Sequence, residues 1–197
     1  QLEPLGFAYQ VTGEARYGDL GARILVEAAR RLPPNAPPVG PGSFAGARGD
    51  ILRALTSGYD WLYPVLSEAE RAEVADAIAA YVRDVLAEAE RPNTWWVPYH
   101  NFIGVAVGAA GRASVALSAR FPEEAPQWRD RAERLIREWL DKGFDEKGAY
   151  AEGVLYAAYG LDNATLFADA LKRSGAADLF DHPRWRQVPR FFAASLL

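Results

Sequence analysis

Apolar and polar residues follow one another along this chain with the period of an α-helix. Between residues 67 and 90, for example, Val74, Ile78, Tyr81 and Val85 recur every three or four positions and would form one buried stripe. No segment clearly shows the two-residue alternation of a half-buried strand. The pattern therefore predicts an all-α fold.

Eight helices follow from this pattern and from the turn residues between them. We expect them at residues 2–12, 14–32, 50–66, from 67 onward, 101–120, 126–142, 154–174 and from 183 onward. The proline- and glycine-rich stretch 33–43 cannot continue a helix, whereas Ser67 and Glu70 have the spacing of a capping box. Successive hairpins of this length favour an incomplete (α/α) toroid of antiparallel helical hairpins, because a bundle usually has four helices.

The fifth predicted helix is built largely of small residues. Gly104, Gly108 and Gly111 lie among alanines within it, although glycine costs a helix interior about 1 kcal/mol relative to alanine. Small side chains allow neighbouring helices to approach closely. We therefore expect this helix to lie in tight contact with others.

Composition narrows the function classes. The 197 residues suffice for one domain, and with 50% hydrophobic and 24% charged residues a packed core is expected. The net charge of −4 argues against non-specific nucleic-acid binding, which needs a broad basic surface. No apolar run has membrane-spanning length, so no membrane partner is expected. The chain has no cysteine, which fits an exported bacterial protein and also a cytosolic one.

The sequence predicts neither a metal site nor a bound cofactor. It has two histidines, no His-Glu pair with ligand spacing and no cysteine, so no recognisable ligand set remains. It also lacks the glycine motifs that bind phosphates and dinucleotides and the serine elbow of hydrolases. Any chemistry must then come from ordinary side chains.

The first loop with candidate chemistry, residues 91–101, ends in His100 and Asn101. His100 is either a packed loop residue or a general base, because an imidazole titrates near neutral pH. Asn101 is either the N-cap of the next helix or, like Asn93, a hydrogen-bond donor to a substrate carboxylate. Trp95, Trp96 and Tyr99 form either core or a platform on which sugar rings stack.

The second such loop, residues 145–159, contains Glu152, Tyr156 and Tyr159. The two tyrosines lie three apart, so they share a helix face. They are either core or, for one of them, a proton donor to a leaving oxygen. Glu152 either favours the positive end of a helix dipole or is one of two carboxylates of a glycosidase, with Asp60 or Asp145 as the other.

These residues together resemble a known family. The similar segments are Ala8–Gly13, Tyr59–Tyr63, Leu66 with Ser67, Asn93–Asn101, and Gly148–Gly153 followed by Tyr156 and Tyr159. Their order and spacing resemble the N-terminal (α/α)-toroid domain of heparinase II/III-like and alginate-lyase-like polysaccharide lyases, over nearly the whole chain.

The resemblance implies β-elimination at a uronic acid. A base removes the C5 proton, an Asn or His neutralises the carboxylate, and a Tyr returns a proton to the departing 4-oxygen. On this chain it makes His100, Asn101 and Tyr156 catalytic, and leaves open which of the first two is the neutraliser. The expected partner is an acidic, uronate-containing polysaccharide, and the expected substrate contacts are Asn93, Trp95, Trp96, Tyr99, Glu152 and Tyr159.

Two further expectations come with it. The family usually has a β-sandwich domain after the toroid, and the apolar run Phe191, Phe192, Leu196 and Leu197 leads us to expect residues 1–197 to be part of a longer, secreted or periplasmic protein. The fragment alone is then expected to lack full activity. The alternatives are an (α/α)-toroid glycoside hydrolase acting on uronides and a non-catalytic helical module that binds carbohydrate.

Overall fold

A computed structural model describes residues 2–34, 44–91 and 97–195, and helices dominate these ranges. The α-helices are α1 (Leu2–Thr12), α2 (Ala15–Arg31), α3 (Phe44–Leu62), α4 (Glu68–Ala89), α5 (Gly108–Ala116), α6 (Glu124–Gly143), α7 (Val154–Arg173) and α8 (Pro183–Ser195). In the described ranges β-structure is limited to an isolated bridge between Phe144 and Tyr150. The predicted all-α fold is confirmed.

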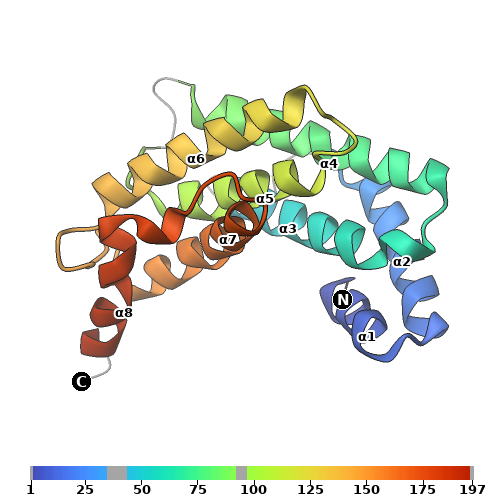
Figure 1. The fold of residues 1–197 in the computed structure, drawn as a ribbon, viewed down its shortest axis with the longest axis horizontal. Helices are drawn as coiled ribbons and strands as arrows, with labels where there is room; N and C mark the ends of the chain where they lie inside the picture. The colour runs from blue at the N-terminus through green and yellow to red at the C-terminus, as the bar shows by residue number, and fades with distance from the viewer. Residues whose placement is uncertain (1, 35–43, 92–96, 196–197) are drawn as a thin grey trace.

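The helices form two rows along a curved arc (Figure 1). Helices α1, α3, α5 and α7 contact one another in sequence order, and α2, α4 and α6 form the second row in the same way. Figure 1 shows α1 and α2 at one end of the arc and α8 at the other. Closure of such rows into a ring, as in a toroid, stays a prediction.

Helix α3 begins earlier than the pattern predicts. It starts at Phe44 rather than at residue 50 and ends at Leu62, where a 3-10 turn (Tyr63–Val65) follows. Its first turns contain Gly49, whose α-carbon lies against the Val105 backbone. Packing of this kind outweighs the low helix propensity of glycine, and so the predicted start is wrong by about two turns.

The predicted fifth helix contains a π-helical turn. Residues Ile103–Val107 form a π-helix, α5 proper runs from Gly108, and it ends at Ala116 rather than at residue 120. All five π-helical residues are buried. The Asn163 side chain of α7 donates a hydrogen bond of 2.9 Å to the Val105 carbonyl. Single π-turns are frequent at functional sites, and this one follows directly on the His100–Asn101 segment.

Two other predictions are confirmed in detail. Ser67 and Glu70 form the capping box of α4: the Ser67 hydroxyl accepts from the Glu70 amide, and the Glu70 carboxylate accepts from the Ser67 amide at 2.8 Å. The predicted α4 stripe is entirely buried, as is the α6 stripe Trp128, Ala132, Leu135 and Trp139.

The small residues of the fifth helical segment allow close contact with α7. A β-carbon on Gly104 would lie 2.5 Å from the Gly160 carbonyl oxygen, and one on Gly108 would lie 2.7 Å from the Ala164 amide nitrogen. These distances are shorter than any non-bonded carbon contact. The two backbones therefore touch, and the predicted close approach is confirmed.

We predict that Gly108→Ala lowers the free energy of unfolding by about 1–3 kcal/mol, because the new methyl group overpacks a backbone contact. Helix propensity alone would favour alanine by about 1 kcal/mol. Urea unfolding therefore shows, by the sign of the change in unfolding free energy, whether overpacking or helix propensity is the larger effect. Gly18→Ala is the control, since the atoms nearest to its methyl group would belong to the side chains of Tyr9 and Val65 and not to backbone. A Gly108→Ala protein as stable as the parent would contradict the contact.

Candidate functional site

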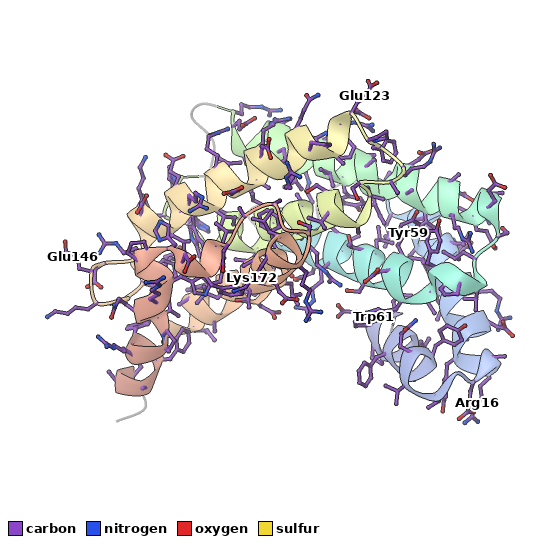
Figure 2. The ribbon with its side chains drawn as sticks, viewed as in Figure 1. Arg16, Tyr59, Trp61, Glu123, Glu146 and Lys172 are labelled. Carbon is purple, nitrogen blue, oxygen red and sulfur yellow. The ribbon has the colours of Figure 1, made fainter. Side chains whose placement is uncertain are left out.

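The loop between α6 and α7 is held in shape by its own backbone. The Asp145 carboxylate accepts hydrogen bonds of 2.8 Å from the amides of Ala149 and Lys147, which lower the pKa of that carboxyl below its ordinary value. Gly148 has φ +85°, and its α-carbon lies against the Gln187 backbone. Figure 2 shows the loop tip at the labelled Glu146.

This loop directs Tyr150 toward the protein interior. The Tyr150 side chain is 5% exposed. Its hydroxyl accepts from the Trp139 indole N–H at 3.0 Å and lies 2.7 Å from the Tyr99 carbonyl oxygen and 3.0 Å from Glu152 Oε2. Burial raises the pKa of Tyr150 far above its usual value. The phenol therefore stays neutral and acts as a hydrogen-bond donor.

Glu152 connects this loop to the start of the fifth helical segment. Its Oε2 accepts from the Asn101 backbone amide at 2.7 Å and from the Asn101 side-chain Nδ2 at 2.9 Å. The carboxylate thus lies at the N-terminal end of a helix, where unpaired amides and the helix dipole favour negative charge.

His100 lies beside the same carboxylate. Its Nδ1 accepts the Phe102 amide at 3.2 Å, and its ring lies 4.3 Å from the Phe102 ring, centroid to centroid. Nδ1 therefore carries no proton in the neutral ring, and Nε2 does. Nε2 lies 3.6 Å from Glu152 Oε1, and a quarter of the His100 side chain (25%) is exposed.

The interpretation of Asn101 as an N-cap is wrong. Asn101 is 1% exposed, its amide nitrogen donates to Glu152, and its Oδ1 makes no hydrogen bond with any described residue. His100 takes the capping position instead, since its ring nitrogen accepts the Phe102 amide. The reason is the orientation of the side chain: Asn101 Nδ2 donates to the Glu152 carboxylate, and Oδ1 then faces no helix amide.

Tyr156 is half exposed (49%) in the first turn of α7. It precedes Gly160 by one turn, and so shares its helix face. A β-carbon on Gly160 would lie 3.3 Å from the Asn101 carbonyl oxygen and 2.8 Å from the Trp139 ring. Tyr156 and His100 therefore lie at the same end of α7.

Tyr159 occupies a different environment. Its hydroxyl donates to the Asp50 carboxylate at 3.2 Å. Burial and the nearby Asp50 charge raise the pKa of Tyr159 to about 12. Tyr156 and Tyr159 were predicted to share one helix face, but their hydroxyls lie in different surroundings.

The remaining predicted residues divide into two groups. The Tyr99 side chain is 48% exposed, while its carbonyl binds Tyr150. Asn93, Trp95 and Trp96 lie outside the described residues. The structure thus brings together His100, Asn101 and Glu152, with Tyr156 at the same end of α7.

Sequence reasoning missed Tyr150, and it did not consider Trp139 for the site. A buried tryptophan needs a partner for its indole N–H, so Trp139 did signal a buried acceptor nearby. The pairing of Tyr150 with Glu152 had no such signal, because it depends on a turn in which the Gly153 amide donates to the Tyr150 carbonyl. Only Trp139 therefore pointed to this part of the site.

The two carboxylates considered as partners of Glu152 in a hydrolase are placed elsewhere or already bonded. The Asp145 carboxylate holds its own loop. Asp60 lines a separate cavity of about 640 Å³ together with Tyr59, Tyr63, Glu68, Arg71, Ala72, Ala116, Ala119 and Arg120. That cavity lies at the C-terminal end of α5, and Figure 2 shows its residue Tyr59 well away from Glu146.

Neither a metal cluster nor a membrane span is found in the described part of the chain. Over residues 2–34, 44–91 and 97–195, no three or more His, Cys, Asp or Glu side chains gather as ligands would. Each helix in those ranges is too short or too polar to cross a bilayer.

Comparison with known proteins gives one distant similarity. No protein-family model matches the chain. It is 28% identical over 177 residues to the exo-oligoalginate lyase of Saccharophagus degradans (strain 2-40), in an alignment that covers 85% of this chain and 24% of that enzyme. The chain therefore spans about a quarter of the length of this relative. The similarity supports a lyase-like relationship at a coarse level.

We predict that Gly148→Ala destabilises the protein more than Gly175→Ala. Both glycines have positive φ, +85° and +74°, so both alanines carry backbone strain of about 1–3 kcal/mol. Only at Gly148 would the methyl group also meet backbone, at 2.6 Å from Gln187, since nothing lies within 4 Å at Gly175. Equal losses in urea unfolding would show that the loop is not fixed against α8.

Proposed function

We propose that this chain is the helical part of a polysaccharide lyase, which cleaves a uronate-containing polysaccharide by β-elimination. One observation carries the proposal: His100 presents its Nε2–H toward a carboxylate oxygen at 3.6 Å. That separation exceeds a hydrogen bond, so the donor is oriented but still available. A substrate carboxylate is the group that such a donor would bind.

His100 is the neutraliser in this proposal, rather than Asn101. The Asn101 amide is buried and donates to Glu152, so it cannot reach a substrate without breaking that bond. His100 is partly exposed and its donor is free to pair. Hydrogen bonding to the uronate carboxylate stabilises the charge that develops there when the C5 proton leaves.

His100 is also a poor general base in this arrangement. Its unprotonated nitrogen, Nδ1, is held by the Phe102 amide, and its outer nitrogen already carries a proton. The proton transfers therefore fall to another group. Tyr156 is the candidate, because its hydroxyl belongs to a half-exposed side chain at the same end of α7.

Tyr159 suits the proton transfers less well. A raised pKa of about 12 and a hydrogen bond to Asp50 hold its proton in place. Tyr159 is better suited to the substrate-contact role expected from the sequence. Tyr99, with its exposed ring, is the other described candidate for that role, and Asn93, Trp95 and Trp96 complete the proposed contact surface.

The proposed reaction balances without a cofactor. Tyr156 accepts the C5 proton, and the electrons of the C–H bond form the C4=C5 double bond. The C4–O4 bond breaks, and O4 receives the phenolic proton that Tyr156 gives up. The products are a new non-reducing end with an unsaturated uronate and a chain ending in a hydroxyl, and Tyr156 returns to its starting state.

The distant exo-oligoalginate lyase supports this class of reaction. Its name fits an acidic saccharide as partner, and a secreted or periplasmic location is proposed from the resemblance alone. The hydrolase alternative has less support, because Glu152 is engaged by Asn101 and Tyr150 and neither proposed carboxylate partner faces it. The substrate specificity and a following β-sandwich domain remain proposals from the resemblance.

Incubation with oligoalginate and other uronate oligosaccharides, followed by the ultraviolet absorbance of the unsaturated product, tests the proposal. We expect Tyr156→Phe to lower kcat by about 10²–10⁴-fold, since proton transfer is lost. We expect His100→Ala to lower it by about 10²–10³-fold, since a donor to the developing charge is lost.

Tyr63→Phe is the matched control for Tyr156→Phe. Tyr63 is a similarly exposed tyrosine (43%) in the 3-10 turn after α3, so its loss should leave kcat unchanged. A hydrolase would instead release reducing ends without absorbance, and would lose activity in Glu152→Gln but not in Tyr156→Phe. Binding of the oligosaccharides without any product would favour the non-catalytic module.

A further inference from the structure

The two histidines of the chain share one local arrangement. In each, Nδ1 accepts the amide two residues further on, from Phe102 for His100 and from Arg184 for His182. In each, Nε2 faces a carboxylate oxygen, at 3.6 Å for His100 and 3.3 Å for His182. Both rings therefore carry their proton on Nε2.

The two carboxylates differ in how firmly they are held. The Asp141 side chain that faces His182 is 65% exposed. The Glu152 side chain is 23% exposed, and its other oxygen lies within hydrogen-bond distance of three donors, two of them from Asn101 and one from Tyr150. A carboxylate held by several donors keeps one position. Oε1 of Glu152 is therefore a fixed point beside the His100 ring.

Two further groups hold the Tyr150 hydroxyl in place. Trp139 donates to its hydroxyl, and the Tyr99 carbonyl lies on its other side. Because Tyr99 immediately precedes His100, the Tyr150 hydroxyl lies between the backbone that carries the imidazole and the carboxylate that faces it, and its one proton can be donated to either acceptor. With 5% of its surface exposed, Tyr150 has no access to a substrate.

We propose that Glu152 and Tyr150 are positioning residues for His100. They hold the imidazole with Nε2–H beside Glu152 Oε1, on a side chain that is one-quarter exposed, and keep the Asn101 amide away from it. The proposal rests on the proposed function of His100. It assigns Glu152 a role through His100, in place of the substrate contact or hydrolytic carboxylate expected from the sequence.

The first test measures the imidazole itself and needs no activity. In protein labelled with nitrogen-15 at histidine, two sets of ring signals are expected, both of the Nε2–H tautomer. In Glu152→Ala, the His100 Nε2–H signal should shift and broaden, because the carboxylate that faces this nitrogen is gone, while the signals of His182 stay in place. Unchanged His100 signals in this variant would overturn the proposal.

The second test separates positioning from stability. Tyr150→Phe and Glu152→Gln should each lower kcat on the uronate substrate by up to about 100-fold, as misplacement of a catalytic group does, with KM nearly unchanged. Tyr81→Phe is the control, since it removes another buried phenol hydrogen bond, to the Leu32 carbonyl at 2.8 Å. It should lower the urea midpoint comparably and leave kcat intact.

The outcomes distinguish the two claims. Equal kcat values for Tyr150→Phe and Tyr81→Phe would overturn the positioning role even in an active lyase. If the parent protein forms no unsaturated product, the proposed function fails, and the His100 Nε2–H signal still decides whether Glu152 orients His100.

Discussion

The partly buried carboxylate of Glu152 is the constraint on which this site depends. A carboxylate shielded from water needs hydrogen-bond donors around it, and here Asn101 provides two, with the Tyr150 hydroxyl also within reach. Meeting that requirement fixes the start of a helix and the amide of Asn101 together, while the Phe102 amide determines which side of His100 carries a proton. These hydrogen bonds leave the outer edge of the His100 imidazole free, and this edge is where chemistry remains possible.

The scaffold makes this constraint rigid through backbone contacts. Gly104 and Gly108 bring the fifth helical segment against α7 without intervening side chains, so the ends of the two segments cannot shift independently. The π-turn that follows Asn101 is supported by Asn163 of α7. The loop before α7 is held by Asp145 and Gly148. Residues far apart in the sequence thus meet with little freedom.

Much of the fold could be predicted from the sequence because helical signals are local. The apolar stripe of α4 and the Ser67–Glu70 capping box lie within a few residues of one another and are confirmed. The start of α3 was not predictable in this way, since Gly49 becomes helical through contact with Val105, more than fifty residues away. The candidate site shows the same limit. His100 and Glu152 could be identified as candidates from the composition of their loops. The hydrogen bond between Asn101 and Glu152 could not be predicted, because it joins residues about fifty positions apart.

The central claim is that the uronate chain is cut by elimination and not by water. Cleavage of an oligouronate in heavy-oxygen water, followed by mass spectrometry of the products, tests it most directly. The account predicts products whose masses sum to that of the substrate and that acquire no heavy oxygen at the cleaved bond. Products that together exceed the substrate by one water, with heavy oxygen incorporated, would contradict it.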